Sequence, residues 1–298
     1  MKKITQIIVP VLLIFILVSC EKQSELTADH RIQNTVSYEQ ITQEYLSSIQ
    51  RVEQPHTYTT TGFWGNLWNK VKKIARKDAS GGLSGGLSTG NINGALWGAV
   101  AASVMEIFQP SNYATGDNFT TGISDLTRLK EVAFSENTFD LAGYNHYVVI
   151  NNVLNNGVNF KLITDPDKQY SMLKDAILKE LSALYPTQTF DSSLDIRKLN
   201  QTLELLEGES YTEGDAYYRR VFPLTDNKSD LKFIEISQLY ERAYEVTKEE
   251  DLASFITYST TMETQLIDDA DLASTMREAL LLKMATLRYG LKYYSLLP

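Results

Sequence analysis

Apolar residues recur every three or four positions through most of the second half of the chain, which is the spacing of one face of an α-helix. The pattern predicts helices over residues 140–155, 169–185, 192–207, 230–247, 249–267 and 270–295. Asp191, Asp230 and the run Glu249-Glu250-Asp251 suit helix starts, because unpaired backbone amides there favour acidic side chains. No long series of alternating apolar and polar residues interrupts them. We therefore expect an all-α fold, an irregular multi-helix bundle.

A shorter helix is predicted near residue 37. Ser37 and Gln40 have the spacing of a capping box, in which the two side chains bond each other's backbone amides. Ile41, Tyr45 and Ile49 then recur every four residues and form one apolar face. Proline, threonine and glycine residues over 53–62 end this pattern.

Residues 79–105 carry no charge, and their glycines follow a regular spacing. Five glycines lie four residues apart and one alanine extends the series: Gly82, Gly86, Gly90, Gly94, Gly98 and Ala102. Side chains four apart share one helical face, so this series lets another helix approach the backbone closely. Each glycine costs a helix about 0.5–1 kcal/mol relative to alanine, which a closely packed partner must offset. We expect a helical hairpin over 63–108, with the rest of the bundle built around it.

The same region supports a second interpretation. A helix over 63–78 combines aromatic and basic side chains that suit a membrane surface: Trp64, Trp68, Lys70, Lys72, Lys73, Arg76 and Lys77. The uncharged segment would then insert into the bilayer, as in pore-forming or bacteriocin-like proteins. Polar residues between the glycines, such as Asn91 and Asn93, are costly in lipid unless they are paired. Packing and insertion both remain open.

The N-terminus has the organisation of a secretory signal. Two lysines precede a short apolar core, and Leu17-Val18-Ser19-Cys20 is similar to a bacterial lipobox. Cleavage would remove residues 1–19 and leave Cys20 acylated at the start of the mature chain. The polar residues up to 36 form a predicted tether, which as a flexible coil would span roughly 20–25 Å. Residues 37–298 are expected to form a single helical domain, with the helical bundle over 140–298.

Composition and charge narrow the range of partners. Removal of the signal lowers the basic residues from 28 to 26 against 37 acidic residues, a net charge of −11. Nucleic-acid binding requires a basic surface, so we expect no nucleic-acid partner. Cys20 is the single cysteine, so no disulfide or cysteine metal site is expected within one mature chain. The sequence contains no motif that predicts a metal or cofactor.

Catalytic chemistry has one weak candidate. His146 lies on a predicted helix, whereas His30 is in the tether and His56 in a loop. A hydrolase centred on His146 would need an orienting carboxylate and a substrate site, so a structural histidine is the favoured interpretation. The acidic cluster Asp268-Asp269-x-Asp271 lacks the loop pattern of a calcium site, and a helix start is favoured there.

The glycine-rich segment resembles those of bacterial envelope lipoproteins that combine a glycine zipper with a helical C-terminal half. The similarity extends to Gly143-Tyr144-Asn145-His146 and to the ending 280–294, with its Arg288-Tyr289 and Tyr293-Tyr294 pairs. Tyr147 departs from the asparagine that follows the histidine in those proteins. The resemblance implies compartment and architecture but no activity. We therefore expect an outer-membrane lipoprotein, held by its lipid anchor, that is not an enzyme and recruits an envelope protein partner.

Overall fold

The computed structural model describes residues 36–50, 122–155, 163, 165–190 and 224–297, with shorter stretches at 68, 72–73, 75, 82, 98–102 and 218–219. The chain divides into two compact units, Met1–Val36 and Ser37–Pro298, and the helices below all belong to the second. The predicted signal, Cys20, nearly all of the tether and the predicted helix over 192–207 lie outside the described residues.

Every regular element within the described ranges is a helix, which confirms the predicted all-α class. In chain order the elements are α2 (Tyr38–Gln50), the 3-10 helix η1 (Leu126–Val132), α6 (Asp140–Asn155), α7 (Pro166–Leu184), α10 (Lys228–Val246), the 3-10 helix η4 (Glu249–Asp251), α11 (Leu252–Ile267) and α12 (Ser274–Ser295). The bounds of α6 agree with the prediction. Those of α7, α10 and α11 differ from it by no more than three residues.

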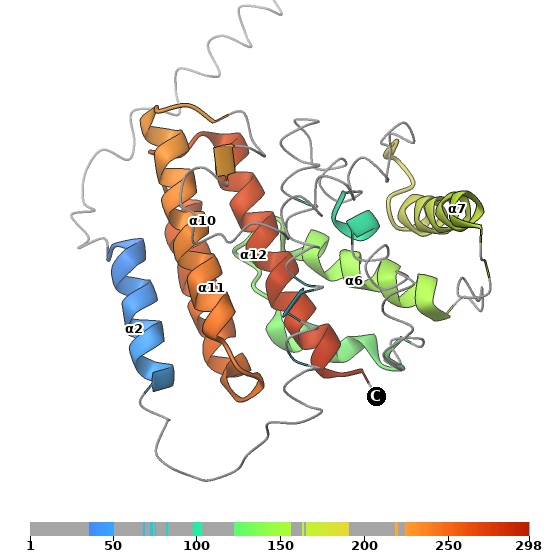
Figure 1. Cartoon of the computed structure of the whole chain (residues 1–298), viewed down its shortest axis with the longest axis horizontal. Coiled ribbons are helices and arrows are strands. Elements are labelled where there is room, and N and C mark those ends of the chain that lie inside the picture. The colour runs from blue at the N-terminus through green and yellow to red at the C-terminus, as the bar shows by residue number, and fades with distance from the viewer. Residues whose placement is uncertain are drawn as a thin grey trace, which may run out of the picture. The chain divides into compact units, whose positions relative to one another are not determined.

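The last helix, α12, occupies the centre of the described bundle. It packs against α6, α10, α11 and η1, and nearly every residue from Ala279 to Tyr294 is buried. The helix α2 lies beside α10 and α11, while α7 packs against α6 (Figure 1). A helix surrounded in this way must be apolar on most of its circumference, which explains the nearly continuous apolar run at the C-terminal end of the chain.

Side chains at the helix starts satisfy amides that the helices leave unpaired. Asp165 accepts hydrogen bonds from the amides of Asp167 and Lys168 at the start of α7, and Asn227 accepts one from Asp230 at the start of α10. Ser37 accepts one from the Gln40 amide, as the predicted capping box requires. The Gln40 side chain instead donates to Glu44, so only half of that box forms.

The start of α12 differs from the prediction. The helix begins at Ser274 rather than 270, and its first turn has no side-chain cap. Asp269 and Asp271 lie before it and form ion pairs with lysines of α10. Their carboxylates hold residues 268–273 in a turn, so the interpretation of this cluster as a helix start is corrected.

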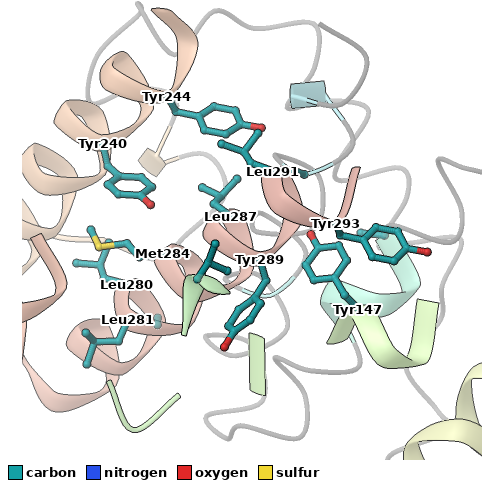
Figure 2. Close-up of a cluster of buried hydrophobic side chains, with 14 of the residues drawn as sticks. Tyr147, Tyr240, Tyr244, Leu280, Leu281, Met284, Leu287, Tyr289, Leu291 and Tyr293 are labelled. Carbon is teal, nitrogen blue, oxygen red and sulfur yellow. The ribbon is translucent and has the colours of Figure 1, made fainter. Parts of the chain in front are cut away.

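The core is rich in aromatic side chains. Tyr240 and Tyr244 of α10 extend towards leucines of α12, and Tyr147 of α6 lies beside Tyr293 (Figure 2). Their hydroxyl groups find partners inside the protein: Tyr240 meets the Ser259 hydroxyl at 2.7 Å, and Tyr293 donates to the Asn151 side chain at 3.1 Å. Tyrosine therefore adds packing area without leaving these buried hydroxyls unpaired.

Glycines allow α6 and α12 to cross closely. A Cβ atom on Gly290 of α12 would lie 2.3 Å from the Tyr147 hydroxyl oxygen, and one on Gly143 of α6 would lie 3.0 Å from the backbone of Ala285. The described structure thus places close helix contacts at two glycines outside the predicted ladder. Within the ladder, Gly82, Gly98 and Ala102 are buried helical residues, whereas Gly86, Gly90 and Gly94 lie outside the described residues.

Candidate functional site: a buried network of charges

A network of charged and polar side chains lies inside the bundle, where α12 meets α11, η1 and the start of α6. Its central residue is Arg288, whose side chain is fully buried. Tyr289 is the next residue of α12, and the other side chains come from distant parts of the sequence: Asn137, Asp140, Tyr240, Ser259 and Glu263.

All three guanidinium nitrogens of Arg288 donate hydrogen bonds. Nε and Nη2 donate to the two carboxylate oxygens of Glu263, at 3.1 and 3.0 Å, in a bidentate pair. Nη2 also donates to Asp140 at 2.8 Å, and Nη1 donates to the carbonyl oxygen of Val132. Burial opposes the guanidinium charge, but the Glu263 and Asp140 carboxylates outweigh it and raise the Arg288 pKa.

The Glu263 carboxylate is also fully occupied. Besides the two bonds from Arg288, it accepts one from Ser259 at 2.9 Å and one from Asn137 at 2.6 Å. Asp140 accepts from Arg288 and from the Tyr289 hydroxyl at 2.8 Å. Burial and the Asp140 carboxylate together raise the pKa of Tyr289.

A second buried ion pair joins α12 to α10. Lys283 lies 2.5 Å from Glu241, and both side chains are almost completely buried. Arg288 pairs with α11 and Lys283 with α10, so the two cations of α12 face different neighbouring helices. Together the two ion pairs require one rotational orientation of α12 about its own axis, relative to α10 and α11.

This arrangement favours a structural role over catalysis. A general base needs a lone pair directed at a substrate, yet four donors surround the Glu263 oxygens. Four of the five N–H donors of the Arg288 guanidinium likewise bind Glu263, Asp140 and the Val132 carbonyl. Such a network fixes the positions of the segments that contribute to it.

A more exposed polar cluster connects α2, α10 and the turn before α12. Lys232 lies 2.7 Å from Asp269 and 3.2 Å from Asp271, and Lys228 lies 2.7 Å from Asp271. Burial alone would lower the Lys232 pKa, but the two carboxylates raise it overall. Hydrogen bonds from Lys228 and Lys232 in turn lower the pKa of Asp271. The Tyr38 hydroxyl of α2 donates to Asp269 at 2.7 Å.

His146, the one catalytic candidate in the sequence, is buried in the core. It is 1% exposed, and its ring meets that of the neighbouring Tyr147 edge-on with 4.5 Å between centroids. His146 therefore has the surroundings of a structural core residue.

Three of the predicted membrane-surface residues are described, and two of them contact the C-terminal end of α10. The Trp68 indole is buried and donates to the Thr247 carbonyl at 2.9 Å, and Lys72 donates to the Glu245 carbonyl at 2.6 Å. A cation is favoured at this end of a helix by its dipole. Lys73 is exposed, while Trp64, Lys70, Arg76 and Lys77 lie outside the described residues. In this arrangement Trp68 belongs to the core.

Sequence reasoning missed the buried charges, although a local signal for them exists. Lys283 and Arg288 interrupt the apolar run of the last helix, and Glu263 stands within the weakly polar segment 258–266. A charge flanked on a helix by apolar neighbours must be buried with a partner or reach the surface along its stem. That signal identifies the charge but not its partner.

The described part of the chain contains no helix that is long and apolar enough to cross a membrane. Within the same residues, no three potential metal-ligating side chains gather in one place. No family model, curated protein or solved structure matches this chain.

Proposed function

We propose that this chain is a lipid-anchored protein of the bacterial outer membrane whose helical body acts as a non-catalytic structural or protein-interaction module. The mutual pairing of Arg288 and Glu263 inside the bundle carries the proposal for the body. The fully buried Glu263 carboxylate pairs with Arg288 rather than with an open site. The lipobox-like segment before Cys20 supports the proposal for the anchor.

The interaction role is supported by what the body presents to solvent. Among the described residues, the large apolar side chains of Leu141, Leu231 and Val246 remain exposed. A lipid anchor confines the body to a membrane plane, where even a modest surface contact benefits from a high effective concentration. Recruitment of an envelope protein is the activity that fits these features.

The anchor is tested with a clickable fatty acid supplied to cells that express the full chain. Acylated wild-type protein should fractionate with the outer membrane, and Cys20→Ala should lose both the label and the membrane association. Label that persists in Cys20→Ala would contradict lipidation at this residue. Sedimentation with the inner membrane would contradict the proposed compartment.

The interaction role is tested by crosslinking in intact cells followed by affinity purification of the anchored protein. A specific envelope protein should be recovered with wild type, and less of it with Cys20→Ala, which lacks the anchor but keeps the body. Repeated recovery of no specific partner would overturn the interaction role. An enzymatic activity that disappears in His146→Ala, with unchanged helix content, would favour the hydrolase alternative.

A further inference from the structure

The helix α2 is attached to the body along one face only. Tyr38, Ile41, Thr42, Tyr45 and Leu46 are buried against α10 and α11. The opposite face is exposed and polar, with Glu39, Gln40, Gln43, Glu44, Ser47 and Ser48. The central helix α12, by contrast, is buried on nearly all sides. α2 is therefore a peripheral element of the bundle, whereas the core around Arg288 lies around α12.

Hydroxyl groups form much of the contact between α2 and the body. The Thr42 hydroxyl lies 3.0 Å from that of Tyr258, and the Tyr45 hydroxyl lies 2.7 Å from that of Thr247. The Tyr45 ring also stacks on Tyr258, with 4.7 Å between centroids. Hydroxyl groups exchange these partners for water when they separate, so each contributes less to docking than a buried apolar side chain of similar size.

The first turn of α2 is held by a charged residue. Tyr38 donates to Asp269 at 2.7 Å, and the ammonium group of Lys232 lies 5.8 Å from the centre of the Tyr38 ring. Asp269 is itself fixed by Lys232 and by the amide of Asp271. Tyr38 is the second residue of the compact unit Ser37–Pro298.

We propose that α2 is a detachable strap, locked by Tyr38 and Asp269, that covers a binding surface for an amphipathic partner helix. Release of α2 exposes Tyr258, Phe255 and Thr247, which are almost completely buried while it is docked. These side chains fit a helix that carries aromatic, aliphatic and hydroxyl groups on one face, as α2 does. The binding of a partner rests on the proposed interaction role, whereas the opening of α2 does not.

Detachment of α2 is coupled to its unfolding. The helix has 13 residues, and an isolated helix of that length is marginally stable in water. Its backbone amides therefore lose their hydrogen bonds when it leaves the body. Hydrogen exchange of these amides measures the opening directly.

The test is hydrogen exchange of the mature full chain, followed by mass spectrometry. The amides of α2 should exchange through an opening that leaves α12 protected. Because a bond to a charged group is lost, Asp269→Asn and Tyr38→Phe should each accelerate exchange in α2 by about tenfold. Exchange in α12 should not change. Tyr38→Phe removes a single oxygen and leaves the turn before α12 intact. It therefore tests the contact even if Asp269→Asn disturbs that turn.

Lys228→Gln is the matched control, because it breaks the exposed pair with Asp271 and leaves the contact between Tyr38 and Asp269 in place. It should leave exchange in α2 unchanged. The proposed strap would be overturned if the amides of α2 exchanged together with those of α12 and neither Tyr38→Phe nor Asp269→Asn changed the exchange rate.

The binding surface is tested with a fluorescent synthetic peptide of residues 37–50. The peptide should bind the Tyr38→Phe protein several-fold more tightly than wild type, because the surface is open more often. A peptide with Tyr45 and Leu46 replaced by serine should not bind. If α2 opens but neither protein binds the peptide, the strap remains and the binding surface is disproved. Failure to recover an envelope partner from cells would affect only the proposed function.

Discussion

At the scale of single residues, the buried charges of α12 constrain the fold more than they stabilise it. Removing two ions from water costs several kcal/mol per ion, and their attraction repays that cost only with good geometry and further hydrogen bonds. Arg288 and Glu263 meet both conditions, since their bidentate pair is surrounded by Asn137, Ser259 and Asp140. Removal of one partner leaves the other as a buried, uncompensated charge.

We therefore predict that Arg288→Met destabilises the protein by about 3–5 kcal/mol, because Glu263 and Asp140 lose their buried cation. Urea unfolding followed by circular dichroism at 222 nm measures this change. Lys292→Met is the control, since Lys292 lies four residues further along the same helix and pairs with the exposed Glu131. It should change stability little.

The double variant Arg288→Met with Glu263→Met separates pairing from packing. Replacement of both ions by apolar side chains should cost less than the sum of the two single changes. Strictly additive losses would mean that Arg288 and Glu263 act independently, and the network would not be the cooperative unit described above.

Asp230 provides a prediction about acid stability. Its carboxylate accepts hydrogen bonds from the Thr225 amide at 2.6 Å and hydroxyl at 2.8 Å. Burial favours the neutral acid, but these bonds outweigh it and lower the Asp230 pKa in the folded state. A lowered pKa contributes stability that is present above the unfolded value of about 3.9 and is lost as the pH falls through the folded value. Unfolding midpoints of wild type should thus decrease below about pH 4.

Asp230→Asn tests this assignment, because asparagine does not titrate. Its stability at pH 7 should be lower than that of wild type, and the difference should shrink as the pH falls from 5 to 2. A difference that is constant over this range would show that the charge of Asp230 contributes nothing.

At the scale of helices, close packing between α6 and α12 depends on two glycines with different tolerances. A Cβ atom at position 290 would overlap the hydroxyl of Tyr147, whose ring is held by Tyr293 and Tyr294. A Cβ atom at position 143 would be tight against Ala285 but would not overlap it. Alanine also gains about 0.5–1 kcal/mol in helix propensity at either position.

Gly290→Ala should accordingly destabilise the protein by about 1–3 kcal/mol, because overpacking outweighs the gain in propensity. Gly143→Ala should cost less than Gly290→Ala, because shifts of a few tenths of an ångström by Ala285 and Tyr289 relieve its contacts of 3.0 Å. Differential scanning calorimetry of both variants provides the comparison. Equal melting temperatures for the two variants would mean that the rings around Gly290 rearrange freely.

How well the sequence predicted each helix depended on how local its signals are. The apolar period of α6 lies within the helix itself. The proline, glycine and acidic residues that mark α7, α10 and α11 lie at or near their ends. The bounds of these four helices were therefore predicted within three residues. The start of α12 was not predicted as closely, because Asp269 and Asp271 pair with Lys228 and Lys232 about forty residues earlier in the chain. Likewise, no spacing indicates that Arg288 meets Asp140, which precedes it by 148 residues.

At the scale of the whole molecule, buried phenols link stability to alkaline pH. Seven described tyrosines have a raised pKa in the folded protein: Tyr38, Tyr45, Tyr185, Tyr240, Tyr258, Tyr289 and Tyr293. Burial is the main cause for all of them, since a phenolate loses its hydration in the core. They lie in α2, α10, α11 and α12 and just after α7, so they report on most of the described bundle.

The sign of this linkage follows from the raised pKa. A folded state that holds the phenolic proton more tightly than the unfolded state is favoured fully below the unfolded pKa of about 10, and it loses this advantage as the pH rises further. For Tyr45 burial raises the pKa to about 12, so its contribution disappears between about pH 10 and 12. The bundle should therefore unfold cooperatively in this range, once several phenols ionise together.

Absorbance of phenolate at 295 nm, recorded with helix content at 222 nm, tests this prediction. The seven tyrosines with a raised pKa should titrate only as helix content falls. Tyr45→Phe should shift the release of α2 to higher pH, because ionisation of Tyr45 favours the detached helix and phenylalanine has no proton to lose. Titration of all 17 tyrosines near pH 10 with unchanged helix content would contradict the aromatic core. In that case solvent would reach the phenols while the helices persist, so the tyrosines would line a loosely packed interior.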